Sequence, residues 1–437
     1  MRGLRLEAAN NQWQPEAWRS LLWAASDNED PAFQFLLADL MLQMPGAALS
    51  ELLPAATSWL QRRYKVLSAT GRPGGPRFLR LWDRFADLTY VPADDGTARD
   101  EPDDDLDTKA LNRPGGVLAW ALLDVLNAPK PERNAGLGAV LRPRFDRIVA
   151  AGGSAGLLAR VYLARHLAYL DAIDPDWVQG CFEPRLAWEH PEALPLWRSY
   201  AHAGIGSSRL FNALKPAALV AFERQLLSDN EFEGLVSKLL SVAIWHQHGE
   251  ASEYELTTAE IRRALTIGPA SARRNVSWNL WRMMGKATQN EPHNDEIGIN
   301  SLDKPTRWRT VIGPLFCAIW PLDVRLRAEG TTRNLVLMAL ESGAAFPEVV
   351  KAILDVIVPY ELYQLAHSLR LEDKHSELVK RHPLAFVQLA NALIDPAAFR
   401  IPGDLAAFLQ ECAAADPAVV TDPAYIRLFG LRRQRNA

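Results

Sequence analysis

Apolar residues recur along most of this chain at intervals of three and four, the spacing of a helix with one buried face. Phe78, Leu81, Trp82 and Phe85 show this pattern most clearly. Almost no stretch alternates apolar and polar residues in the manner of a strand. The pattern therefore predicts a long succession of helices. We expect them at 15–25, 31–44, 47–68, 76–90, 116–128, 137–151, 155–171, 175–186, 191–203, 208–227, 230–248, 257–266, 270–287, 304–319, 331–343, 346–357, 361–370, 374–393, 402–415 and 422–431.

An Asp-Pro pair precedes several apolar stretches with helical spacing. An Asp carboxylate can accept the free N–H groups of a first helical turn. Pro suits the next position, because it lacks an N–H and its φ angle is already helical. Each pair therefore predicts the start of a helix. The pairs are Asp30-Pro31, Asp174-Pro175, Asp395-Pro396, Asp416-Pro417 and Asp422-Pro423.

The predicted helices follow one another as pairs. A pair spans about 35 to 45 residues, which is the size of a HEAT-like repeat. The pairs cannot be aligned to one strict period. The sequence therefore predicts an all-α fold, an irregular helical repeat (HEAT-like) solenoid of helix pairs. Such a stack presents long surfaces to binding partners.

One acidic segment interrupts the helical pattern. Residues 92–107 hold seven Asp and one Glu against a single Arg, a net charge of −7. This segment is too polar to bury enough apolar surface to offset its ordering entropy. We therefore expect an N-terminal helical bundle or first repeats at 1–91 and an acidic flexible loop or linker at 92–114. The main helical-repeat body, with an Arg-rich tail, is expected at 115–437.

Composition and charge indicate a soluble cytoplasmic protein. The chain has 437 residues, of which 48% are hydrophobic, and a net charge of −4. This balance does not indicate nucleic acid or an anionic membrane as a bulk partner. Cys181, Cys317 and Cys412 are far apart in the sequence, so a reducing compartment is expected. Neither a signal peptide nor a membrane span is predicted.

Residues 152–156 match G-x-S-x-G, the nucleophile elbow of α/β-hydrolases, with Ser154 as the candidate nucleophile. That chemistry requires a strand entering the turn, whereas Leu141, Phe145 and Ile148 before it have helical spacing. The simpler interpretation is a helix that ends at Gly and a following helix that Ser154 caps. A hydrolase site near Ser154 remains an alternative function.

Two polar clusters are candidate metal sites. His246 and His248, with Glu250 or Glu253, could supply ligands, but two helical residues two positions apart point in different directions. The acidic residues 103–105 lack the spaced ligands and central Gly of an EF-hand loop. We therefore expect no metal and no cofactor.

Arginine and tryptophan alternate in two places. Such sets can contact phosphates and stack on bases, although the Trp side chains of a helix more often face the core. This surface is the candidate interaction site, and a nucleic-acid-binding helical module is a second alternative function. The candidate residues are Arg273, Arg274, Trp278, Trp281, Arg282, Arg307, Trp308 and Arg309.

Several phrases, taken in order, resemble the C-terminal helical region of bacterial sirtuin-like antiviral defence proteins. The resemblance covers most of residues 15–430. The phrases are Leu111-Asn112-Arg113-Pro114-Gly115-Gly116-Val117-Leu118-Ala119, Tyr162-Leu163-Ala164-Arg165-His166-Leu167-Ala168-Tyr169-Leu170, Asp174-Pro175-Asp176-Trp177, Leu214-Lys215-Pro216, Ala345-Phe346-Pro347-Glu348 and Ala415-Asp416-Pro417-Ala418, continuing through Thr421-Asp422-Pro423 to Arg427-Leu428.

In that family a sirtuin-like domain degrades NAD, and the helical region senses phage components and holds the assembly together. This sequence has no Gly-rich strand-turn-helix of that enzyme, so the resemblance carries no catalytic residue over to it. The resemblance implies either a piece of a larger or split protein or a stand-alone relative, with a partner supplying the enzyme. We therefore expect a non-enzymatic, protein-binding sensor or scaffold module of an anti-phage defence system. Its expected partners are an effector subunit, a phage protein or both. We expect no membrane partner.

Overall fold

The computed structural model describes residues 13–68, 76–90, 105–247, 249, 253–285, 301–369, 376–397 and 400–435. Every regular element in these ranges is a helix, which confirms the predicted all-α class. The chain divides into two compact units, Met1–Ala217 and Ala218–Ala437, and the division falls within α14 (Ser208–Arg224). No helix in the described ranges is both long enough and apolar enough to span a membrane.

Two rows of helices form the first unit. One row contains α2 (Pro15–Ala25), α4 (Gly46–Arg62), α8 (Pro114–Asn127), α10 (Gly153–Arg165) and α13 (Ala193–Ala201), each packed on the next. The other row contains α3 (Pro31–Gln43), α6 (Pro76–Thr89), α9 (Gly138–Ala150) and the π-helical turn η3 (Val178–Phe182). Two ion pairs join α9 to α6, Arg144 to Asp83 at 2.6 Å and Arg147 to Asp87 at 2.8 Å. Shorter elements complete the unit: α5 (Tyr64–Leu67), α7 (Leu106–Asn112), α11 (Leu167–Ile173), α12 (Pro175–Trp177) and η4 (Glu183–Leu186).

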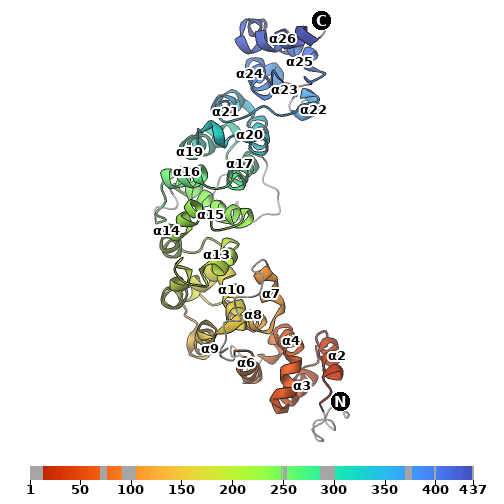
Figure 1. Cartoon of the computed structure of the whole chain (residues 1–437), viewed down its shortest axis with the longest axis vertical. Helices are drawn as coiled ribbons and strands as arrows, with labels where there is room; N and C mark the ends of the chain where they lie inside the picture. The colour runs from red at the N-terminus through yellow and green to blue at the C-terminus, as the bar shows by residue number, and fades with distance from the viewer. Residues whose placement is uncertain are drawn as a thin grey trace. The chain divides into compact units, whose positions relative to one another are not determined.

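The second unit repeats this arrangement (Figure 1). One row contains α15 (Asp229–Gln247), α17 (Ala270–Met284) and α20 (Glu329–Glu341), and the other α16 (Thr258–Ile267), α19 (Gly313–Ile319) and α21 (Phe346–Ile353). Next, α21 packs on α24 (Pro383–Leu393), and α24 packs on α25 (Leu405–Ala415) and α26 (Pro423–Arg435). The packing of alternate helices confirms an irregular repeat of helix pairs. Shorter elements are α18 (Lys304–Arg307), η7 (Trp308–Ile312), η8 (Val324–Leu326), η9 (Gly343–Ala345), α22 (Leu365–Ser368), α23 (Ser376–Arg381) and η10 (Pro417–Thr421).

All five Asp-Pro carboxylates accept a backbone N–H two or three residues later. The distances are 3.0 Å for Asp30 and Asp174, 2.9 Å for Asp416, and 2.8 Å for Asp395 and Asp422. Four of the prolines begin a helix, as predicted. Asp395 precedes a turn instead, and residues 398–399 lie outside the described ranges.

The structure divides each of the predicted helices 47–68, 155–171 and 374–393 into two, and it differs further from the prediction in two other segments. Helix α7 occupies Leu106–Asn112, within the predicted loop 92–114, while residues 91–104 lie outside the described ranges. The predicted helix 361–370 is wrong, because only Leu365–Ser368 is helical there. Backbone groups in this region bond to distant segments instead, with Tyr360 N donating to Leu393 O and the Asp404 carboxylate accepting from Leu365 N. Hydrogen bonds to residues distant in the sequence thus take the place of those that a local helix would form.

Tryptophans tie neighbouring helices together. Trp59 and Trp82 are fully buried. Trp59 Nε1 donates to the side chain of Gln34 at 2.8 Å, and Trp82 Nε1 donates to Leu118 O at 3.0 Å. Each ring therefore buries a large apolar surface while its N–H bonds to another helix. These structural roles account for some of the chain's tryptophans without requiring that they bind a ligand.

Candidate partner-binding groove

Three of the eight predicted interaction residues are buried. Arg273, Arg307 and Trp308 are 7%, 5% and 4% exposed. Arg273 Nη1 donates to Leu265 O at 2.7 Å and to Gly268 O at 2.9 Å, at the end of α16. Arg307 Nη1 donates to Gly285 O at 3.0 Å, after the end of α17. Burial lowers the pKa of both guanidinium groups. Both arginines therefore cap helices inside the stack, where a ligand at the surface does not reach them.

The other predicted residues reach the surface to different extents. Arg274 pairs with Glu233 at 3.2 Å, and Arg309 forms a bidentate pair with Glu348. The guanidinium of Arg282 lies 4.5 Å from the ring centre of Trp278, and both Arg282 and Trp281 are half-buried. A role for these residues in binding stays a prediction.

Arginine caps recur elsewhere in the chain. Arg160 on α10 is 2% exposed and donates to Ile148 O at 3.1 Å, near the end of α9. Arg427 on α26 donates to Ile394 O at 3.0 Å, after the end of α24. The last carbonyl groups of a helix lack partners within it, so a guanidinium from a helix later in the chain satisfies them. The sequence offered one signal that was missed, an Arg such as Arg160 in an otherwise apolar helix.

The segment around Ser154 does not have the geometry of a nucleophile elbow. Helix α9 continues to Ala150, so a helix enters the turn in place of the required strand. Gly152 caps α10, which places Ser154 within the first turn instead of at the predicted cap. Two of the glycines have structural roles. A Cβ on Gly156 would lie 2.2 Å from Ala151 O, and Gly153 adopts a positive φ of +65°. The motif is therefore a tight connection between two helices.

The described ranges contain no group of three His, Cys, Asp or Glu side chains that could hold a metal ion. His248 and Glu250 lie outside those ranges, as do Asp103 and Asp104.

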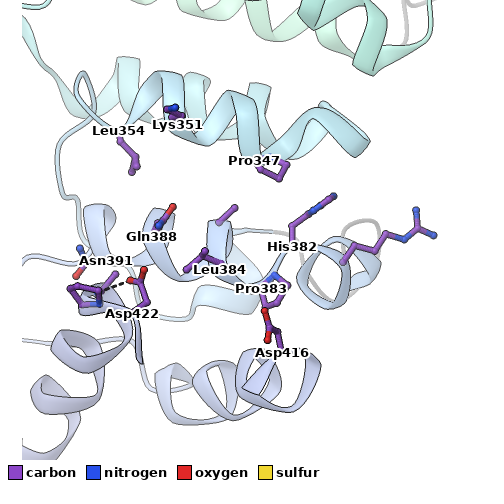
Figure 2. A pocket seen from close by; sticks show the side chains of 14 residues that line it. Pro347, Lys351, Leu354, His382, Pro383, Leu384, Gln388, Asn391, Asp416 and Asp422 are labelled. Atoms are coloured by element: carbon purple, nitrogen blue, oxygen red, sulfur yellow. Dashed lines mark hydrogen bonds between the residues drawn. The ribbon is translucent and has the colours of Figure 1, made fainter. Parts of the chain in front are cut away.

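A concave groove of about 840 Å³ lies between α21, α24 and the start of α26, within the second unit (Figure 2). Three prolines at helix starts lie along it, Pro347, Pro383 and Pro423. The sequence marked Pro423 as a helix start and placed Pro383 inside the predicted helix 374–393, which the structure instead divides before Pro383. It did not reveal that the three prolines meet. The remaining lining residues are Lys351, Leu354, Arg381, His382, Leu384, Ala385, Gln388, Asn391, Asp416, Asp422 and Ala424.

Two amide side chains lie along the α24 wall of the groove. Gln388 and Asn391 are three positions apart, and therefore on the same face of the helix. Arg427 Nη1 donates to Asn391 Oδ1 at 2.8 Å, which leaves the Asn391 NH₂ group to act as a donor. In Figure 2 the Gln388 side chain points from α24 toward α21. The groove thus presents amide groups that can both donate and accept hydrogen bonds.

The groove is lined by charges of both signs. Asp416 and Asp422 each accept a backbone N–H as caps. Lys351 and Arg381 are exposed, and neither forms an ion pair with another described residue. Burial, and then the charge of Arg381, lower the pKa of His382, so its ring is neutral at neutral pH. The groove thus carries two cationic and two anionic side chains.

The sequence is similar to a protein of Sinorhizobium fredii (strain NBRC 101917 / NGR234) that bears the name "Uncharacterized protein y4cA". The two are 23% identical over 332 residues, which cover 74% of this chain and 26% of the relative. The chain thus spans about a quarter of the length of that relative. No family model matches the sequence, and no solved structure matches it. The name of the relative states no activity.

Proposed function

We propose that this chain is a non-enzymatic, protein-binding sensor or scaffold module of a bacterial anti-phage defence system. The observation that carries the proposal is the open groove between α21, α24 and α26, set in a repeat of helix pairs. Helical repeats serve as binding surfaces, because each added pair extends the exposed face. The amides and charges along this groove suit recognition of another chain.

The defence context rests on the resemblance to sirtuin-like antiviral proteins. Several of the phrases that carry it have structural roles in this chain. Asp174 caps α12, and a Cβ on Gly115 would lie 2.3 Å from Ala155 O, in α10. Such positions support a shared helical architecture. The defence role and the effector partner are therefore our proposal for this architecture.

The proposed mechanism is binding. A phage protein or a companion subunit docks on the helical repeat and favours one of two states of an effector. It can do so only by the difference between its affinities for the two states. We place the complex in the cytoplasm, because the three cysteines are far apart in sequence and form no disulfide framework.

Affinity purification of the tagged chain from its own host, before and during phage infection, tests the proposal. Mass spectrometry identifies the co-purifying proteins, and the tag alone serves as the control. A stoichiometric effector subunit, or a phage protein that appears only on infection, is the expected result. A chain that purifies alone in both conditions would overturn the proposal. So would turnover of a substrate by the purified chain, abolished by one substitution.

A further inference from the structure

Helix α8 in the first unit reaches the surface along a single stripe. It lies between α4 and α10 and also contacts α5, α6, α7 and α9 (Figure 1). From position 115 to position 127, the residues that are not buried are Trp120, Asp124 and Asn127. They recur at intervals of four and three, and therefore lie on one face of the helix. We call these three residues the α8 stripe.

Two donors orient the carboxylate of the α8 stripe. Gln61 Nε2, on α4, donates to Asp124 Oδ2 at 2.8 Å. The Trp120 side chain donates to the same carboxylate. An ionised carboxylate has about four acceptor positions, so two donors leave others open to a ligand. The group is therefore held in position while it can still accept further hydrogen bonds.

The charge of Asp124 forms no ion pair with another described residue. The positions three and four residues away on α8 hold neither Lys nor Arg. Lys65 is exposed, and its ammonium group lies 5.9 Å from the centre of the Tyr64 ring. Burial raises the pKa of Asp124, although its two hydrogen-bond donors and the charge of Lys65 lower it. A cation that docks against this half-buried carboxylate would therefore stabilise its charged form.

Aromatic side chains of three helices lie near this carboxylate. Trp120, on α8, stacks on Tyr162, on α10, with the ring centres 5.9 Å apart. Burial, and then the charge of Asp124, raise the pKa of Tyr64 on α5 and of Tyr162. Trp120 and Tyr64 are half-buried, so part of each side chain reaches the surface. Aromatic faces attract cations, and that of Trp does so most strongly, so the rings and the carboxylate favour the same kind of ligand.

Helix α3 shows which cation suits such a pair. Phe35 and Asp39 are four positions apart on α3, as are the Trp ring and the carboxylate of the α8 stripe. Arg77, on α6, places its guanidinium 4.6 Å from the centre of the Phe35 ring and donates from Nε to Asp39 Oδ1 at 3.2 Å. A planar guanidinium can stack on a ring and donate to a carboxylate at once, whereas an ammonium group is a compact point charge. The α8 stripe thus has the ring and the carboxylate of an arginine site.

On the basis of the proposed protein-binding function, we infer that the α8 stripe binds an arginine side chain of the partner protein. The guanidinium donates to the Asp124 carboxylate and stacks on the exposed part of the Trp120 ring. The contact repeats between two proteins what Arg77 forms within this one.

A library of random short peptides, selected on the immobilised full chain, tests this inference. The test variant is Asp124→Asn, which removes the charge and keeps an acceptor for Gln61. The control is Asp27→Asn, the same change at an exposed Asp of the first unit. The unaltered chain and the control should both enrich peptides with Arg at a fixed position. The test variant should lose this enrichment.

A double-mutant cycle then measures the contact itself. The consensus peptide is synthesised with its Arg and with citrulline, a neutral analogue of similar shape, in the same position. On the unaltered chain, citrulline should weaken binding about tenfold, because a hydrogen-bonded charge pair is lost. On Asp124→Asn, citrulline should change the affinity by less than about twofold. A peptide with Lys in this position should bind the unaltered chain several-fold more weakly than the Arg peptide.

Four outcomes would overturn the inference. These are absence of Arg enrichment, enrichment that persists on Asp124→Asn, independent effects of citrulline and Asp124→Asn, and equal affinity for the Lys peptide. Self-association of the unaltered chain in sedimentation, lost on Asp124→Asn, would also overturn it and assign the stripe to a second copy of the chain.

The test variant also distinguishes this inference from the proposed function. If affinity purification with Asp124→Asn still recovers the partner found with the unaltered chain in full yield, protein binding stands and the role of the α8 stripe fails. If the unaltered chain recovers no partner, the proposed function itself fails.

Discussion

Arg273 and Leu265 join two successive helices, with Arg273 Nη1 on α17 donating to the main-chain oxygen of Leu265 at 2.7 Å. The same nitrogen lies 2.9 Å from Gly268 O. The end of α16 is thereby satisfied by a side chain from the helix that follows it. Arg274, the next residue, points outward and forms an ion pair with Glu233. Two adjacent arginines thus have different physical roles.

Replacing Arg273 by Met should destabilise the protein by about 2–3 kcal/mol. The change leaves two buried carbonyl oxygens without their donor, and a buried unpaired acceptor is costly. Urea unfolding followed by circular dichroism measures the effect. Arg274→Met is the matched control and should cost less than about 1 kcal/mol, because exposed ion pairs contribute little. Equal effects of the two substitutions would contradict the capping role of Arg273.

Gly116→Ala should destabilise the first unit by about 3 kcal/mol or more. A Cβ there would lie 1.9 Å from the oxygen of Ala110, so α7 and α8 would have to separate. Gly180→Ala is the control, because Gly180 is helical, exposed and has no atom within 4 Å of the added Cβ. The control should be neutral or stabilising by about 0.5–1 kcal/mol. Thermal unfolding of both variants checks the prediction, and a stable Gly116→Ala protein would refute it.

Lys238 should make stability depend on pH in the alkaline range. Burial of its ammonium group on α15 lowers the pKa of Lys238 from 10.5 to about 7. Between these values the unfolded chain binds more protons than the folded chain, so the free energy of unfolding should rise with pH. Below pH 7 both states are protonated, and this contribution no longer changes.

Lys238→Met removes this titration. Urea unfolding of both proteins from pH 7 to 10 should show a smaller rise with pH in the variant than in the unaltered chain. Parallel curves for the two proteins would show that the folded-state pKa of Lys238 is not lowered.

Ser154→Ala should leave stability unchanged and, on the proposed function, should leave anti-phage protection unchanged as well. Ser154 is exposed in the first turn of α10, and exposed substitutions away from caps change stability by about 0.5 kcal/mol or less. Plaque counts on hosts that express the variant measure protection, with hosts that express the unaltered chain as the comparison. Loss of protection with Ser154→Ala in a stably folded chain would favour the hydrolase alternative.

Only single features of the candidate groove could be predicted from the sequence. The sequence marked Asp416 and Asp422 as helix starts, because capping depends on a few adjacent residues. It contained no signal that these starts line the same groove as Gln388. Only some of the Arg and Trp residues predicted to form an interaction site lie at the surface. An alternation of basic and aromatic residues does not distinguish Arg273, in the interior, from Arg274, at the surface.

The sequence by itself determined the helical class and most helix starts, because apolar spacing and capping act over three or four residues. The tertiary structure decided which polar groups are buried and which residues from distant parts of the sequence contact one another. Arg307 reaches Gly285 across 22 positions, and Arg427 reaches Asn391 across 36. Such contacts depend on how distant helices pack, and local spacing contains no record of that packing.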